Sequence, residues 1–147
     1  MSPAHDPAED QAQQVAVASA AAMWAGDRAS QALGMEIVEV GPGRAVLRMV
    51  VREDMVNGHA IGHGGLTFTL ADSAFAFACN SYGRTTVAAG AEIRFRAPTR
   101  LGDVLTATAV ERSRQGGSGV YDVQVTSGDT VVASFVGHSR EIGDTFG

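Results

Sequence analysis

Lysine is missing from this 147-residue chain, and cysteine, tryptophan and tyrosine are scarce. The single cysteine, Cys79, excludes a disulfide within one chain. All 11 basic residues are arginines, whose guanidinium groups bind phosphates in a bidentate manner. An anionic ligand is therefore compatible with the sequence, although the chain as a whole is acidic.

An excess of positive charge is lacking too. The net charge is -5 at pH 7, with 11 basic against 16 acidic side chains, which disfavours a nucleic-acid partner. The most apolar early run, residues 15–25, is too short and too rich in alanine to span a bilayer, so we expect no membrane association. The first ten residues are acidic and lack the basic start of a signal peptide. We therefore expect a cytoplasmic protein.

The length and composition predict one globular domain. Hydrophobic residues make up 45% of the chain and charged residues 18%, which is enough to build a core without disulfides or a metal. Prolines and charges near the start predict a disordered tail over residues 1–10. A single domain is expected over residues 11–147.

The chain between residues 10 and 143 alternates between helical and strand-like segments. Residues 10–33 favour a helix, with a break at Gly26, a cap at Asp27 and a stop at Gly34. Residues 35–51 are typical of a hairpin. Four further strands are expected at residues 85–96, 104–114, 120–126 and 130–142. Their connections are too short for crossover helices, so the strands should be antiparallel.

A polar loop rich in glycine precedes an apolar helix at residues 57–82 and is the most informative feature. Gly64 and Gly65 stand at the helix start, where free N–H groups and the helix dipole attract a polarised oxygen. Asp72 lies among leucine, phenylalanine and alanine, where a carboxylate is costly unless it has a function or a partner. This combination predicts a site that polarises a carbonyl group.

The segment HGGLTFTLADSAFAFACNSYG, preceded by NGHAIG, resembles the signature of the hotdog-fold thioesterases, and most closely the phenylacetyl-CoA thioesterase (PaaI) branch. The resemblance covers residues 20–143 in order and spacing. It implies an α+β hotdog fold: a curved antiparallel sheet of five to six strands wrapped around a long central helix. It also implies a homodimer or homotetramer with active sites at subunit interfaces.

The resemblance further assigns roles to individual residues. Gly64 would donate its N–H to the thioester oxygen, and Asp72 would act as general base or nucleophile. Asn57 and His63 would bind the carbonyl or shape the site around it. Gly65 and Phe68 would contact the substrate, with Phe68 in the acyl pocket. The hydroxyl residue that relatives commonly carry on the strand after the helix has no counterpart at residues 88–90.

A metal site is not expected, although His59 and His63 are four residues apart. The surrounding glycines argue against the helix that would align the two rings, and no further ligand completes a set. Cys79 lies late in the apolar helix and away from any base, so it is not expected to act as a nucleophile. No cofactor is implied, because coenzyme A would be part of the substrate.

The predicted function is hydrolysis of phenylacetyl-CoA, hydroxyphenylacetyl-CoA or a related acyl-CoA to free acid and CoA. One alternative is a hotdog enoyl-CoA hydratase or dehydratase, for which Asp54, Asn57 and His59 show the right residue types at the wrong spacing. The other is a non-catalytic acyl-CoA-binding module. The acyl-chain specificity, the arginines that bind CoA phosphates and the choice between dimer and tetramer stay open.

Overall fold

The computed structural model describes residues 6–145. Three α-helices, one 3-10 turn and six strands follow in the order α1 (Pro7–Gly26), α2 (Arg28–Ala32), β1 (Glu36–Gly41), β2 (Arg44–Val50), η1 (Glu53–Met55), α3 (Gly64–Cys79), β3 (Arg84–Phe95), β4 (Val104–Gln115), β5 (Ser118–Ser127) and β6 (Thr130–Thr145).

The start of α1 corrects the predicted disordered tail. Residues 7–10 are helical, because Asp6 accepts a hydrogen bond from the Ala8 N–H at 2.9 Å and Pro7 suits the first helical turn. The rest of the predicted tail, residues 1–5, lies outside the described residues. The predicted break is confirmed, since Asp27 ends α1 and caps α2 through the Ser30 N–H.

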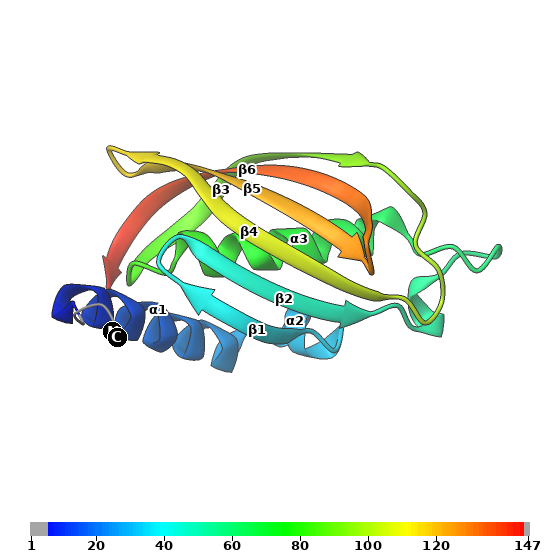
Figure 1. The fold of residues 1–147 in the computed structure, drawn as a ribbon, viewed down its shortest axis with the longest axis horizontal. Helices are drawn as coiled ribbons and strands as arrows, with labels where there is room; N and C mark the ends of the chain where they lie inside the picture. Colours follow the sequence, from blue (N-terminus) through cyan, green and yellow to red (C-terminus); the bar gives the residue numbers. More distant parts are fainter. Residues whose placement is uncertain (1–5, 146–147) are drawn as a thin grey trace, which may run out of the picture.

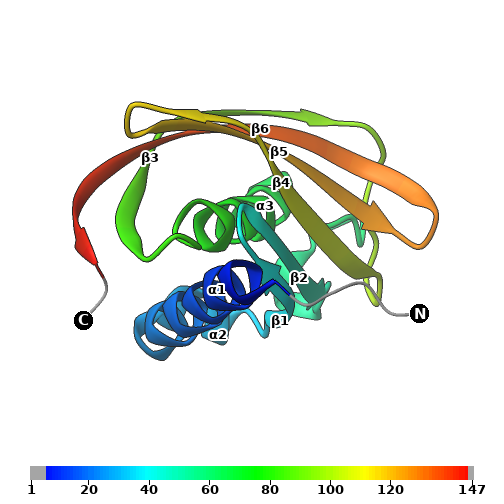
Figure 2. The same cartoon turned by 60° about the vertical axis from the view of Figure 1, so that its left-hand side comes forward.

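The six strands form one antiparallel sheet in the order β1-β2-β4-β5-β6-β3. Register shifts interrupt several pairs, including β3 with β6 between Ala88 and Gly90, and such bulges bend and twist a sheet. The sheet arches over α3 in Figure 1, and the view in Figure 2 shows it curling down on both sides of that helix. The predicted α+β hotdog fold is confirmed.

The core lies between α3 and the concave face of the sheet. Leu70, Phe75 and Phe77 are almost fully buried on α3. The Phe75 ring packs on Tyr121 and Phe135 with centroids 5.6 Å and 5.8 Å away. A Cβ on Gly137 would stand 2.7 Å from the Phe75 ring, so only glycine lets β6 pass this close to the helix.

The two edges of the sheet differ. The β1 edge lies beside α1, whose Gln13 side chain donates a hydrogen bond to the Val40 carbonyl at 2.7 Å (Figure 2). The β3 edge has no such cover among the described residues, and all of its 12 residues except Thr85, Thr86 and Ile93 are exposed. A long open edge strand is a template for pairing with another strand.

Candidate active site

The loop before α3 is organised by Asn57. Its side-chain Oδ1 accepts hydrogen bonds from the backbone N–H groups of His59 at 2.9 Å and Ile61 at 3.2 Å. Its own N–H donates to the Ile61 carbonyl at 2.8 Å, which closes the loop on itself. The amide oxygen of Asn57 therefore serves the loop backbone, a role that the sequence did not indicate.

The far side of the loop is held against the segment after β3. The Gly62 N–H donates to the Thr99 carbonyl at 2.9 Å, and a Cβ on Gly62 would stand only 2.0 Å from the Thr99 hydroxyl. Ala60, at the tip, has a φ of 59°, the left-handed region that costs a non-glycine residue energy. The loop is thus held by hydrogen bonds at both ends while Ala60, between them, has a strained backbone conformation.

The loop delivers two free N–H groups to the start of α3. The His63 N–H donates to the Met55 carbonyl at 2.8 Å, while the His63 side chain makes no capping bond. Within residues 6–145, the N–H groups of Gly64 and Gly65 have no acceptor. Two free donors at the positive end of a helix dipole can stabilise a developing negative charge.

A cavity of about 420 Å³ opens beside these donors, between the start of α3 and the segment that links β3 to β4. It is lined by Gly62, Gly64, Thr67, Phe95, Arg96, Ala97, Pro98, Thr99 and Val132. Thr67 and Thr99 are 3% and 5% exposed, so the cavity has two largely buried hydroxyl residues in its wall.

Three lining residues were missed in the sequence. Thr67 lies in the expected helix, but no motif marks it as a site residue. Thr99 lies between two expected strands, in a connection whose sequence indicated only a turn. Phe95 was read as one more strand residue, although an aromatic side chain at the open end of an edge strand could have indicated a surface with a function.

Asp72 lies half-buried two turns into α3. Burial raises the pKa of its carboxyl above the ordinary value of 3.8. Its oxygens have no hydrogen-bond or ion-pair partner among the residues described. A carboxylate with a raised pKa and free oxygens is a stronger base than an ordinary aspartate and is suited to accept a proton.

Gly64 and Asp72 of one chain are separated along the helix that carries both. Eight residues at 1.5 Å each place them about 12 Å apart along the axis. A carbonyl oxygen bound at hydrogen-bond distance from the Gly64 N–H is therefore out of reach of the same chain's Asp72. Within one chain, the Gly64 N–H and the Asp72 carboxylate are therefore too far apart to contact the same carbonyl group.

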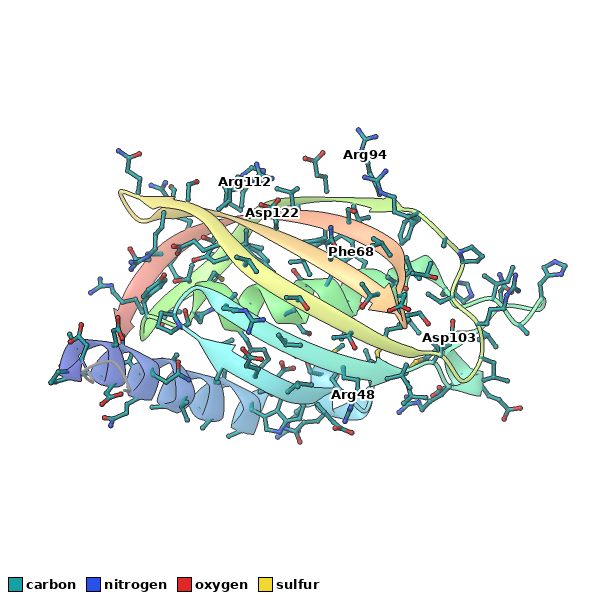
Figure 3. All side chains as sticks on the ribbon, viewed as in Figure 1. Arg48, Phe68, Arg94, Asp103, Arg112 and Asp122 are labelled. Carbon is teal, nitrogen blue, oxygen red and sulfur yellow. The ribbon has the colours of Figure 1, made fainter. Side chains whose placement is uncertain are left out.

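The remaining predicted residues lie around these two groups. Phe68 is half-buried and its ring meets Phe135 edge-on at 5.3 Å, between α3 and the sheet in Figure 3. His59 is exposed at the loop tip. Asp54 pairs with Arg52 at 3.0 Å, so its carboxylate is engaged on the surface rather than with a histidine.

Neither a metal centre nor a cysteine nucleophile is built from the residues that the structure describes. No group of three histidine, cysteine, aspartate or glutamate side chains in residues 6–145 could hold a metal ion. Burial raises the pKa of Cys79 to about 12, so its thiol is protonated at neutral pH.

Comparisons with known proteins place these features in a family. Residues 59–134 match the profile of the Thioesterase superfamily. The chain is 44% identical over 128 residues to the acyl-coenzyme A thioesterase PaaI of Escherichia coli K12, covering 86% of this chain and 91% of that protein. The chain belongs to the thioesterase superfamily. The predicted family and the predicted thioester-hydrolase activity are confirmed.

Solved structures agree with this assignment. The E. coli PaaI protein from the phenylacetic acid degradation operon superposes with a TM-score of 0.88 at 43% identity, covering 90% of this chain and 97% of that one. A hypothetical thioesterase from Streptococcus pneumoniae TIGR4, solved with coenzyme A, gives 0.72 at 25% identity over 76% and 88% of the two chains. The thioesterase family requires no cofactor. Among the described helices, none has the length and apolarity to cross a bilayer.

Proposed function

We propose that this thioesterase hydrolyses acyl-CoA thioesters of aryl-acetic acids, such as phenylacetyl-CoA, in an active site shared by two copies of the chain. The observation that carries the proposal is the pairing of unbonded N–H groups at the start of α3 with an unpartnered carboxylate on the same helix. The E. coli relative is named an acyl-coenzyme A thioesterase, and its structure is described as that of a protein from the phenylacetic acid degradation operon. The first name supports an acyl-CoA substrate, and the operon favours an aryl-acetyl group.

In the proposed reaction the Gly64 N–H binds the thioester oxygen. A water molecule attacks the carbonyl carbon while Asp72 accepts its proton, and the negative charge passes to the oxygen held by Gly64. The carbon–sulfur bond then breaks and the CoA sulfur takes the proton from Asp72. One backbone donor aimed at such an oxyanion is worth about 3 kcal/mol. Direct attack by Asp72 is the second route, and would pass through an anhydride.

The other predicted residues support these two groups. Asn57 holds the loop that ends at Gly64, through the bonds its side chain accepts from His59 and Ile61. His63 stands at the N-cap position of α3, directly before the proposed donor. Gly65 supplies a second free N–H. Phe68, half-buried on α3 beside Phe135, is proposed to contact the acyl group.

The second copy supplies the missing half of each site. The 12 Å between Gly64 and Asp72 along one helix requires the partner's carboxylate to approach from elsewhere. The open β3 edge offers a way to do this, because two such edges can pair and continue the sheet across a dimer. Two such dimers would form the proposed tetramer. The cytoplasmic location stays a prediction.

The first test follows free thiol after the protein is mixed with phenylacetyl-CoA. We expect turnover with thiol release, and slower release from short straight-chain thioesters such as acetyl-CoA. Hydration of an enoyl-CoA without thiol release would instead favour the hydratase alternative. Tight binding of CoA without turnover would favour the binding module.

A subunit-mixing experiment tests the shared site. Asp72→Asn removes the base, and Gly64→Pro removes the N–H at a first helical position that tolerates proline. Each variant alone should keep about a hundredth of wild-type activity or less. After the two are unfolded together and refolded, random pairing gives about half mixed dimers with one intact site each, so activity should return to about a quarter of wild type. No recovery would show that both groups act within one chain.

A further inference from the structure

We infer that Phe95 is a specificity-determining residue of the acyl site, whose ring forms the wall against which an aryl group packs beside the Gly64 N–H. The inference rests on the proposed function and names a residue that the family signature does not contain. It is carried by the position of the ring, its exposure and the shape of the cavity.

The Phe95 ring lies against the glycine that carries the proposed oxyanion donor. A Cβ on Gly64 would stand 2.8 Å and 3.0 Å from two carbons of the ring. Such distances are shorter than carbon–carbon contact, so the tip of the Phe95 ring occupies the space that a side chain on Gly64 would need. Substrate bound at the Gly64 N–H is therefore adjacent to an aromatic ring.

The sheet fixes this position. Phe95 ends β3 opposite Ala133, and the Arg96 N–H donates to the Val132 carbonyl at 2.8 Å. Side chains alternate along a strand. Arg94 points away from the sheet on its outer side in Figure 3, and the Arg96 Nε donates to the Ser134 hydroxyl at 3.4 Å. Phe95, between them, is directed towards α3.

Within the single chain, much of the Phe95 ring is left uncovered by its own neighbours. It is 57% exposed, although it is one of the largest apolar side chains in the protein and lines the cavity of about 420 Å³. The other candidate aromatic, Phe68, already has its ring packed edge-on against Phe135. Aromatic pairs gain stability beyond their buried area when stacked with an offset or edge to face. An aryl-acetyl group, with one methylene between ring and carbonyl, suits a wall this near the oxyanion donor.

The test compares kcat/KM for phenylacetyl-CoA with that for hexanoyl-CoA in Phe95→Leu and Phe95→Ala. Loss of the ring should lower the aryl-to-alkyl ratio about three- to tenfold, and Phe95→Leu isolates the aromatic contribution because it keeps most of the apolar volume. The control is Leu101→Ala. Leu101 is 48% exposed in the segment that links β3 to β4 and does not line the cavity, so the ratio of this variant should match wild type.

An unchanged ratio in both Phe95 variants would overturn the inference and leave the proposed function standing. A purely structural role would lower both substrates equally and would also overturn it. A wild-type enzyme that does not hydrolyse the aryl thioester would overturn the proposed function, and this inference with it.

A second measurement tests the contact itself. Gly64→Ala should lower Tm in the wild-type background, because its Cβ meets the Phe95 ring, and should lower it less in the Phe95→Ala background. Equal losses in the two backgrounds would show that the ring does not lie against Gly64, and the inference would fail.

Discussion

The two ends of α3 are built in opposite ways. At the N-terminal end, two N–H groups lack acceptors among the described residues, the preceding loop has a strained alanine, and a cavity stands open. At the C-terminal end, side chains bond the helix to its surroundings. The Ser81 hydroxyl accepts a hydrogen bond from the Gly43 N–H at 2.8 Å, and the Asn80 side chain pairs with both backbone groups of Thr86.

A cluster of Tyr82, Glu111, Arg114 and Tyr121 completes the C-terminal end. The Glu111 carboxylate accepts from the Tyr82 hydroxyl at 2.8 Å and from the Tyr121 hydroxyl at 3.1 Å. The Arg114 guanidinium lies 3.7 Å from the centre of the Tyr82 ring. Burial and the Glu111 carboxylate raise the pKa of Tyr82 to about 12, so it stays a hydrogen-bond donor at neutral pH.

The two ends of α3 therefore have different roles: the C-terminal end supports the fold, and the N-terminal end is available for chemistry. Polar groups that are satisfied stabilise a fold, whereas groups left unsatisfied next to a cavity are available to a ligand. The C-terminal end fixes the helix, and the fixed helix holds Gly64 and Asp72 in place. Substitutions at the two ends should therefore affect different quantities, activity at one and stability at the other.

The largest expected effect is that of Asp72→Asn. Removing a general base should lower kcat for phenylacetyl-CoA by about 10²- to 10⁴-fold. The raised pKa of Asp72 also predicts that the acid limb of wild-type kcat lies above the ordinary aspartate value of 3.8. Thiol release measured across pH checks both.

Stability of the same variant is the control. Because the folded state raises the Asp72 pKa, this group favours the fold fully below pH 3.8 and loses that contribution as pH rises through its folded pKa. At neutral pH the amide should therefore give an equal or higher Tm, and the gain should vanish in acid. A variant that loses Tm at pH 7 would show Asp72 to be structural.

The next largest effect concerns the Gly64 N–H. Gly64→Ala and Gly64→Pro both place a Cβ against Phe95, but only proline removes the donor. The extended backbone of His63 suits a following proline. We expect kcat about 10²- to 10³-fold lower in the proline variant and about tenfold higher activity in the alanine variant than in the proline one. Equal kcat values in the two variants would remove the N–H from the mechanism.

At the other end, Glu111→Ala should cost stability. It leaves two tyrosine hydroxyls without their acceptor, one of them on Tyr121, which is 1% exposed, so unfolding free energy should fall by about 2 kcal/mol. Glu111→Gln keeps an acceptor oxygen and is the matched control. Denaturant titration measures the loss, while kcat of the folded protein should change less than about twofold. A large fall in kcat would break the comparison between the two ends.

Much of this architecture could be predicted because local signals agree with it. The hairpin at residues 35–51, the cap at Asp27 and the stop at Gly34, whose φ is 72°, each depend on local backbone conformation. The antiparallel strands and the apolar helix can then be packed together in few ways. The tail boundary failed because the Asp6–Pro7 helix start was read only as turn and charge.

The site was harder to predict because its walls come from distant segments. Gly64 and Asp72 stand out as residue types in a local context. Phe95 reaches the helix start through the pairing of β3 with β6, and Thr99 does so through the Gly62 N–H. The role of Asn57 in its own loop depends on backbone geometry that no residue type specifies. Contacts of this kind need the tertiary fold.

The smallest expected effect tests the strain in the loop. Ala60 has a φ of 59°, where glycine avoids the clash of a Cβ but loses more chain entropy on folding. Ala60→Gly should therefore raise stability by only about 0.5 kcal/mol, and Ala60→Val, the matched control, should lower it by more than that. Thermal unfolding resolves the two.

The kcat of the Ala60→Gly variant shows whether the strained conformation contributes to catalysis. If the strained turn only connects Asn57 to Gly62, the glycine variant should keep kcat within about twofold, because both ends of the loop are held by the Asn57 and Thr99 bonds. A marked fall in kcat alongside the higher Tm would mean that the alanine stiffens the loop for catalysis. The strained conformation of Ala60 would then contribute to catalysis at the N-terminal end of α3, in addition to closing the loop.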